Sequence, residues 1–483
     1  MKRKLFKHQK EALQLFLNKE KFALFMDMGT GKTLVPIVAL EKLEGLDTVL
    51  IFSPKSIVFN WESEIHKFTK LKEYKIFKLQ GNKTKVMETY RAIKSYSGLK
   101  IIIANFEKAR LMDKYLMNLK PQFIVVDESH KVKNRNAQIS KALYKIATKC
   151  KYRLIMTGTP TPNGYEDLFM QYKIMNSNIL GVNWKQFEDD FIIKGGYMNY
   201  EIVGYKNEEI LKNLMHQNCY IVRIEDCIDL PEQLPDLYLT CELNNKARKA
   251  YNDLRKEMIA QLDIVQENIP RKQLKALLRS NGIPYESNEP YEDLFLRANM
   301  FINQLTADLT ITQYLRLQQI SGGFITNNVG NSINIDKGKL GLLQDYLEGY
   351  KKPVVVICNF LEEIKLIHDT FKKTHRVECL TGSTKNRAEI NKDFQEGKID
   401  ILILQISSGS VGLNLFRASR LIFYSWNYKY DDYVQAIARI KRNGQKEPWQ
   451  IIHLITENTI DEKILKSIQL KRDRAEKLLT IDK

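Results

Sequence analysis

Long hydrophobic runs are absent from this sequence. Its 483 residues contain no stretch of about 18 apolar residues, and the mean hydropathy is -0.35, whereas a membrane-spanning helix needs about 20 such residues. The first 16 residues include a basic cluster but neither the apolar stretch nor the small-residue cleavage site of a secretory signal. We therefore expect a soluble protein that is not secreted.

Cysteine, proline and glycine are also scarce. The six cysteines form no CxxC pair and have no histidine at metal-ligand spacing, which excludes a disulfide scaffold and a zinc site and indicates buried thiols in a reducing compartment. With 12 prolines, 23 glycines and 44% hydrophobic residues, the composition is that of a multi-domain globular protein rather than a disordered chain.

Acidic residues are fewer than basic ones. Lys and Arg number 75 against 57 Asp and Glu, which leaves a formal charge of +18 and a pI near 9.3. This excess favours a polyanionic partner, and charge alone does not separate nucleic acid from an anionic membrane or from a generally basic surface.

Short apolar runs recur along the chain, with helix-like segments between them. They form two series, at 48–52, 100–103, 123–126 and 153–156, and at 354–357, 399–404, 421–424 and 451–455. Apolar runs of this length between helical patterns are typical of parallel sheets covered by helices on both faces. The sequence therefore predicts an α/β fold with two domains in tandem.

The crossing between the domains is predicted in a polar stretch that contains Pro231 and Pro235. This gives an N-terminal domain at 1–223 and a C-terminal domain at 224–483. Within the second domain the alternation stops at 266–303, where a Lys/Arg-rich helix and an acidic segment indicate a small helical insertion. The basic amphipathic tail at 461–477 is predicted to be a solvated helix packed on the second sheet.

The segment MDMGTGKT (26–33) lies between an apolar run and a helical pattern, which is the context of a phosphate-binding loop. Gly29 and Gly31 would let backbone N–H groups approach phosphates, Lys32 would reach the β and γ phosphates, and the Thr33 hydroxyl would ligate Mg²⁺. Met26 replaces the usual first glycine, and a chance glycine-rich turn is the alternative interpretation.

The segment FIVVDESH (123–130) is a buried-strand pattern that runs into two carboxylates. Asp127 and Glu128 are therefore placed at the carboxyl edge of a sheet, where Asp127 would hold the Mg²⁺ shell and Glu128 would polarise the attacking water. The alternative is a pair of helix-capping residues. A phosphate loop about 95 residues upstream favours ATP hydrolysis.

The segment QAIARIKRNGQ (435–445) places Arg439 and Arg442 three residues apart, which predicts one helical face. Both guanidiniums would then point across a cleft and stabilise charge on the γ phosphate. The alternative interpretation is a solvated basic helix face.

Further segments occur in a recognisable order: KHQKEAL, SPKSIVFNWESEI, DESHKVKN, LIMTGTPTPN, YIVRIEDCIDLP, KGKLGLLQDYL, LTGSTKNRAEINKDF and SSGSVGLNL. With these motifs the chain resembles the Swi/Snf-like ATPases of the superfamily-two helicase fold, over nearly its whole length apart from the insertion. The resemblance implies two tandem RecA-like lobes with ATP and Mg²⁺ between them.

The resemblance also implies individual site residues. Gln9 corresponds to an adenine-sensing glutamine, and the implied nucleotide contacts are Gln9, Gly29, Thr30, Gly31, Lys32, Thr33 and Gly412. The implied DNA contacts are Lys55, Asn105, Thr157, Thr159, Ser408 and Ser410. Such contacts grip phosphates without reading sequence, and for each residue a cap or turn role is the alternative.

The sequence departs from the family pattern in places. Lys441 stands where a histidine is common and Asn443 where an aliphatic residue is common, and the loop YSWNYKYDDY is short. The flanking reader domains of chromatin remodelers are not seen, so we expect a minimal motor of bacterial or phage type in the cytoplasm.

The expected function is ATP-dependent translocation on double-stranded DNA without sequence preference. No membrane is expected as a partner. The alternatives are a helicase that separates DNA or RNA strands, and a nucleic-acid clamp that does not hydrolyse ATP. The insertion at 266–303 is predicted to be either an accessory DNA grip or a docking surface for a protein partner.

Overall fold

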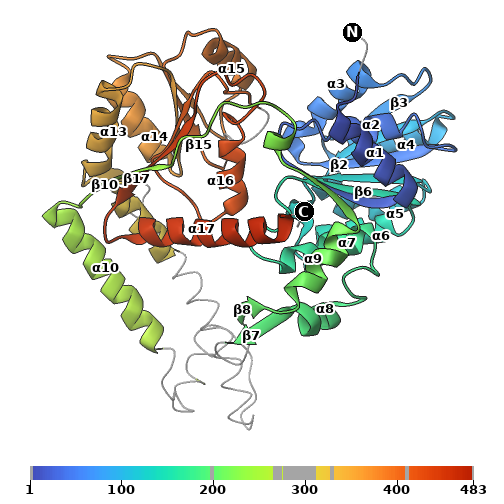
Figure 1. Cartoon of the computed structure of the whole chain (residues 1–483), viewed down its shortest axis with the longest axis horizontal. Helices are drawn as coiled ribbons and strands as arrows, with labels where there is room; N and C mark the ends of the chain where they lie inside the picture. Colours follow the sequence, from blue (N-terminus) through green and yellow to red (C-terminus); the bar gives the residue numbers. More distant parts are fainter. Residues whose placement is uncertain are drawn as a thin grey trace.

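Two parallel sheets, each covered by helices on both faces, form the two lobes of the chain (Figure 1). The computed structural model describes residues 4–195, 201–264, 275, 312–326, 331–407 and 413–480. The predicted fold class of two tandem parallel-sheet domains is confirmed. No helix in these ranges is long and apolar enough to span a membrane.

The first sheet has seven strands in the order β3-β4-β2-β5-β6-β1-β9, and all of its neighbouring strands are parallel. Its strands are β1 (Lys21–Met26), β2 (Thr48–Ser53), β3 (Lys75–Leu79), β4 (Lys100–Asn105), β5 (Phe123–Asp127), β6 (Tyr152–Thr157) and β9 (Cys219–Val222). Alternate residues of β2 enter opposite cores, Leu50 on one face and Ile51 on the other. The continuous apolar runs in the sequence follow from this burial on two faces.

Three helices cover one face of this sheet, α1 (Lys7–Lys19), α2 (Leu34–Ala39) and α3 (Val58–Phe68). The other face packs against α4 (Lys83–Ser95), α5 (Phe106–Met117), α6 (Gln138–Ala147) and α7 (Glu166–Met175). Below these lie α8 (Trp184–Phe191), α9 (Glu208–His216) and the antiparallel pair β7 (Ile192–Gly195) and β8 (Glu201–Tyr205).

The second sheet has six parallel strands in the order β10-β17-β16-β13-β15-β14. They are β10 (Leu237–Cys241), β13 (Val354–Cys358), β14 (Val377–Leu380), β15 (Ile401–Gln405), β16 (Arg420–Phe423) and β17 (Gln450–Thr456). One face packs against α13 (Gly338–Glu348) and α14 (Leu361–Phe371). The other face packs against α10 (Asn245–Ile264), α15 (Arg387–Gln395), α16 (Tyr430–Ile437) and α17 (Ile460–Leu479).

The lobes meet in sequence where β9 ends at Val222 and β10 begins at Leu237, on either side of the predicted boundary at 223/224. A short antiparallel pair, β11 (Phe324–Thr326) and β12 (Ser332–Asn334), was not foreseen from the sequence. The predicted insertion at 266–303 lies outside the described residues except for Lys275, so its helical character stays a prediction.

Helix α17 differs from its expected position on the second sheet alone. Ile464 and Ile468 pack in the second core, but Leu478 is only 2% exposed and belongs to the core of the first lobe. There, the backbone oxygen of Leu478 lies 2.9 Å from Nε2 of His216, and Lys477 pairs with Glu208 at 2.8 Å. The apolar stripe of the helix is long enough to serve two cores, so α17 crosses from one lobe to the other (Figure 1).

Candidate active site

The predicted catalytic residues surround one cavity of about 440 Å³ between the lobes. The first lobe contributes the loop after β1, the end of β5 and one side of α3. The second lobe contributes α16 and the turn that follows it. Ligands of parallel-sheet proteins bind at this carboxyl edge of the strands.

The loop after β1 is held in the shape of a phosphate cradle. Gly29 and Gly31 have φ angles of 88° and 73°, in the left-handed region that glycine enters without strain. A Cβ on Gly31 would also lie 2.5 Å from Nε2 of Gln9. Thr30 is buried and donates its hydroxyl to the backbone oxygen of Asp27 at 2.7 Å. This backbone requires glycine at both positions, and its contacts with phosphate stay a prediction.

Gln9 fixes this loop to the start of α1. Its Nε2 donates to the backbone oxygens of Thr30 and Gly31 at 3.1 and 3.3 Å, and its Oε1 accepts the N–H of Phe6 at 3.0 Å. Nε2 of His8 lies 2.9 Å from the same Thr30 oxygen, a contact that the sequence did not reveal. The adenine contact of Gln9 stays a prediction.

Lys32, Asp127 and Glu128 lie together at the floor of the cavity. Nζ of Lys32 is 3.5 Å from Oε1 of Glu128. Nζ of Lys32 and Oε2 of Glu128 are buried without a hydrogen-bond partner among the described residues, although buried polar groups normally have one. A phosphate at Lys32 and a water at Glu128 would supply these partners.

Glu128 does not act as a helix cap. It precedes the short helix η2 (Ser129–Val132), yet its side chain makes no capping hydrogen bond. Its φ of 52° is in the left-handed region, which costs a non-glycine residue about 1 kcal/mol or more and is typical of functional sites. This backbone turns the carboxylate toward Lys32 and His130.

Burial and neighbouring charges set the pKa values of Asp127 and Glu128. Burial raises the pKa of Asp127 to about 7, and the charge of Glu128 adds to this effect. Burial also raises the pKa of Glu128, but Lys32 and the cations beyond it outweigh burial and leave that pKa below its usual value. Asp127 is thus a carboxylate that a nearby cation would stabilise.

Thr33 and Asp127 fit a magnesium ion that arrives with its nucleotide. Both line the cavity, and the described residues hold no cluster of three or more His, Cys, Asp or Glu side chains that could bind a metal alone. Mg²⁺ is commonly held by one or two protein oxygens, with phosphates and water completing the shell. A hydroxyl and a carboxylate beside a phosphate cradle meet this requirement.

Arg439 and Arg442 reach the cavity from the second lobe, but not from one helical face as predicted. Helix α16 ends at Ile437, and both arginines follow it in a series of turns that leads into Gly444, whose φ is 106°. Nη1 of Arg442 donates to the backbone oxygen of Leu413 at 2.8 Å, and Nη1 of Arg439 reaches the same oxygen at 3.4 Å.

A solvated basic face is not what the structure contains. Arg439 is buried, and burial together with Arg442 lowers its pKa to about 9. Its Nε has no hydrogen-bond partner among the described residues. An anion in the cavity would satisfy this group.

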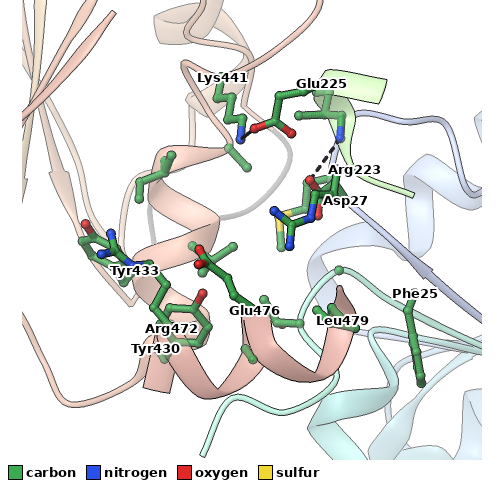
Figure 2. A pocket seen from close by; sticks show the side chains of 18 of the residues that line it. Phe25, Asp27, Arg223, Glu225, Tyr430, Tyr433, Lys441, Arg472, Glu476 and Leu479 are labelled. Carbon is green, nitrogen blue, oxygen red and sulfur yellow. Dashed lines mark hydrogen bonds and ion pairs between the residues drawn. The ribbon is translucent and has the colours of Figure 1, made fainter. Parts of the chain in front are cut away.

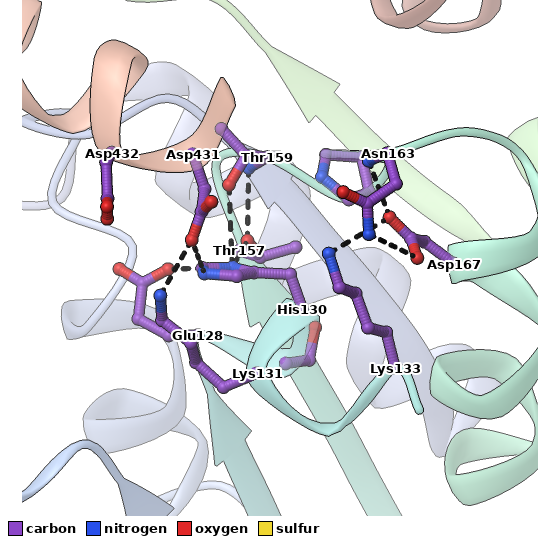
Figure 3. A network of polar contacts seen from close by, with 12 residues as sticks. Glu128, His130, Lys131, Lys133, Thr157, Thr159, Asn163, Asp167, Asp431 and Asp432 are labelled. Carbon is purple, nitrogen blue, oxygen red and sulfur yellow. Dashed lines mark hydrogen bonds and ion pairs between the residues drawn. The ribbon is translucent and has the colours of Figure 1, made fainter. Parts of the chain in front are cut away.

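His130 follows β5 and contacts residues of β6 and α16 (Figure 3). Its Nδ1 lies 2.8 Å from Oγ1 of Thr157 and 3.4 Å from Oε2 of Glu128, and its Nε2 lies 3.6 Å from Oδ2 of Asp431 on α16. Burial lowers the pKa of His130 to about 4, so the ring is neutral near pH 7. Lys131 binds Asp431 as well, at 2.7 Å, and thereby joins the two lobes.

The predicted DNA contacts divide into separate groups. Thr157 and Thr159 are buried, with their hydroxyls at His130, and their contact with DNA stays a prediction. Asn105 caps α5 by accepting the N–H of Lys108 at 3.1 Å, the role that the sequence left as its alternative. Lys55 is exposed. Ser408, Ser410 and the predicted nucleotide contact Gly412 lie outside the described residues.

A second cavity, of about 270 Å³, is lined by Asp27 and Met28 at the start of the phosphate loop and by residues of the second lobe (Figure 2). The side chain of Asp27 faces it and accepts the N–H of Ile224 at 3.1 Å, while burial raises the pKa of this carboxyl. Across the cavity, Lys441 of the second lobe forms an ion pair with Glu225. Helices α16 and α17 complete its wall.

Comparison with known families matches two successive domains. Residues 8–285 match the SNF2-related domain, and residues 338–444 match the helicase conserved C-terminal domain. An uncharacterized ATP-dependent helicase of Mycoplasma genitalium is 27% identical over 99% of this chain and 42% of its own length. The DNA repair and recombination protein RDH54 of Saccharomyces cerevisiae is 27% identical over 94% of this chain and 49% of its own.

A third relative, the RAD54-like DNA repair and recombination protein of Gallus gallus, is 26% identical over 91% of this chain and 61% of its own. The chain thus spans about half the length of the curated relatives it matches. Among solved structures, the Sulfolobus solfataricus SWI2/SNF2 ATPase core in complex with dsDNA is 22% identical, with a TM-score of 0.43, over 99% of this chain and 93% of that one.

Proposed function

Since the chain belongs to the SNF2-related family, with a helicase C-terminal domain after its first lobe, we propose that it is a DNA-dependent ATPase that moves along double-stranded DNA. One observation carries the proposal. Lys32 and Glu128 of the first lobe and Arg439 of the second face the same cavity, and each has a buried polar atom with no hydrogen-bond partner in the part of the chain that the structure describes.

In this proposal the first lobe binds ATP. Backbone N–H groups around Gly29 and Gly31 and the ammonium of Lys32 hold the β and γ phosphates. Thr33 and Asp127 hold Mg²⁺, which neutralises charge on the phosphates when it is bound. Gln9 is bonded to the loop, and its predicted adenine contact would couple the base to the phosphate cradle.

Hydrolysis uses groups of both lobes. Glu128 accepts a hydrogen bond from a water and directs its oxygen at the γ phosphorus. A new P–O bond forms as the bond to the β–γ bridging oxygen breaks; ADP leaves with the electron pair of that bond, and the proton lost by the water passes to the released phosphate. Arg439 and Arg442 stabilise the charge on the phosphoryl oxygens. Arg442 now binds the Leu413 oxygen and Asn414, so it must exchange these neutral acceptors for phosphate, which attracts a guanidinium more strongly.

The two lobes are joined near the cavity by contacts that can break and re-form. Lys131 and Asp431 form an ion pair between the lobes, and Lys441 pairs with Glu225 of the segment that connects them. Each pair has one well-exposed partner, Lys131 at 39% and Glu225 at 55%, so each contributes about 0–1 kcal/mol. Nucleotide binding and release can therefore shift the lobes between closed and open states. A cycle of this kind moves one lobe along a polyanion per ATP.

Double-stranded DNA is the proposed track. The formal charge of +18 supports a polyanionic partner, and two relatives are named as DNA repair and recombination proteins. Binding through phosphates would give no sequence preference. A protein partner at 266–303 and a cytoplasmic location stay predictions.

Strand separation is the second candidate, because the Mycoplasma genitalium relative is named a helicase. To separate the two, ATP hydrolysis is measured with duplex DNA, single-stranded DNA and RNA, together with two displacement assays. Release of a triplex-forming third strand from intact duplex supports translocation. Unwinding of a forked duplex without third-strand release favours the helicase, and absence of turnover with every nucleic acid leaves a clamp.

A further inference from the structure

We propose that α3 supplies two positioning residues for the magnesium ion of the reaction, Trp61 acting through Asp127 and Glu64 acting through Thr33. The inference rests on the proposed ATPase function, and both residues lie outside the phosphate loop and the DESH segment. Trp61 and Glu64 are three residues apart on α3 and therefore share a face of the helix. That face lines the cavity between the lobes.

Trp61 binds the carboxylate of Asp127 directly. The indole is buried among apolar residues of the first lobe, and its Nε1 donates to Oδ2 of Asp127 at 2.9 Å. The other carboxylate oxygen, Oδ1, accepts the N–H of Glu128 at 3.0 Å. Two donors from different directions fix the plane of the carboxylate, and each oxygen keeps a lone pair for a metal-bound water or the metal itself.

Packing alone does not require a tryptophan here. A buried indole N–H without an acceptor is destabilising, and a phenylalanine would fill most of the same volume without needing an acceptor. Tryptophan has a donor and no acceptor, so it can hold a carboxylate in its ionised form without competing for the cation. Hydrogen bonds of this type to metal-binding side chains commonly change metal affinity by about 10–100-fold.

Glu64 performs the matching task for Thr33. Both residues line the cavity; burial raises the pKa of the Glu64 carboxyl, and a hydrogen bond from the Thr33 hydroxyl lowers it by less. A hydroxyl that binds a metal uses an oxygen lone pair, so its single proton must point elsewhere. When the Glu64 carboxyl accepts that proton, the lone pairs of Thr33 are left for the cavity.

The test compares nucleotide binding with and without metal. Fluorescent mant-ADP is titrated into the full chain over a series of MgCl₂ concentrations and, separately, in EDTA. We expect Trp61→Phe to raise the Mg²⁺ concentration for half-maximal tight binding by about 10-fold, with the EDTA affinity unchanged. Glu64→Met, which lacks the acceptor, should behave in the same way, whereas Glu64→Gln keeps a carbonyl acceptor and should stay within about threefold of the wild type.

Two control variants remove the same residue types elsewhere. Trp184→Phe loses an indole that donates to Glu188 at 2.8 Å on α8, and Glu62→Gln alters α3 at a side chain that binds Lys78 at 2.6 Å. Both should leave the magnesium dependence unchanged. If Trp61→Phe does not fold, which thermal melting detects, the Glu64 variants decide the matter.

Several results would overturn the inference. Equal losses of affinity with Mg²⁺ and with EDTA would mean that α3 only shapes the pocket. A Glu64→Gln protein as impaired as Glu64→Met would remove the orienting role of Glu64. Failure of the proposed function looks different: the wild-type chain itself would then show neither magnesium-dependent binding of mant-ADP nor hydrolysis of ATP.

Discussion

Replacing Asp431 by asparagine should weaken the closed arrangement of the two lobes. Asp431 lies in the first turn of α16 and accepts Lys131 from the catalytic loop of the other lobe at 2.7 Å. Burial raises the pKa of Asp431 and is the largest single effect, but the charge and hydrogen bond of Lys131 together with His130 and Lys133 outweigh it, so the net pKa is below its usual value. The carboxylate is therefore ionised, and Asp431→Asn removes its charge while keeping its shape.

The size of the effect follows from exposure. The Lys131 side chain is 39% exposed, so solvent screens the pair and its contribution is about 0.5–1 kcal/mol rather than that of a buried pair. Since about 1.4 kcal/mol corresponds to a factor of ten, the ratio of closed to open molecules should fall by about two- to fivefold. In the proposed cycle the arginines of the second lobe act only in the closed state, so the DNA-stimulated kcat should fall by no more than this factor.

Energy transfer between dyes on the two lobes measures this ratio. Unnatural amino acids at Leu111 and Lys372, both exposed and on different lobes, carry the dyes without involving the native cysteines. Asp432→Asn is the matched control, since Asp432 accepts Asn427 of its own lobe at 2.8 Å. High salt should bring wild type and Asp431→Asn together. An unchanged distance distribution in Asp431→Asn at low salt would refute the reasoning.

Three further outcomes are expected. Lys32→Ala should abolish hydrolysis and weaken ATP binding, whereas Glu128→Gln should abolish hydrolysis but retain bound ATP. Filter binding measures the bound ATP and a phosphate-release assay measures hydrolysis. Turnover in either variant would contradict the catalytic role proposed for that residue. Arg442→Ala should bind ATP normally but lose DNA-stimulated kcat by on the order of 10³ in steady-state assays, and an unchanged kcat would exclude it from the reaction. Burial raises the pKa of Glu363 on α14 from 4.5 to about 7, against the hydrogen bond from Ser425. The protonated Glu363 contributes fully to stability below pH 4.5, and about 3 kcal/mol of the free energy of unfolding is lost as pH rises to 7. Denaturant melts should therefore show Glu363→Gln becoming more stable relative to the wild type over this interval. Parallel pH profiles of the two proteins would contradict this expectation.

The parts of the fold that the sequence predicts are those with a local pattern. The strands β2, β5 and β13 are continuous apolar runs because helices cover both of their faces. The phosphate loop is readable because only glycine tolerates the backbone at Gly29 and Gly31. Each of these requirements concerns only a few neighbouring residues, so it can be recognised in the local sequence.

Other features depend on residues far apart in the chain. The bond from Trp61 to Asp127 spans 66 positions, and the pair of Lys131 with Asp431 spans 300. No local spacing encodes such contacts. The predicted helical face of Arg439 and Arg442 was wrong because helix propensity in QAIARIKR does not reveal that α16 ends at Ile437.

The path of α17 constrains how the lobes can turn. Besides the ion pair of Lys131 with Asp431, the lobes are connected through the chain after Val222 and through Leu478 at the far end of α17, and each connection limits how one lobe can rotate relative to the other. Val222 and Leu479 line the cavity of about 270 Å³, and residues of α16 line both this cavity and the one of about 440 Å³. Because α16 lies between the two cavities, a displacement of this helix toward one of them would move it away from the other.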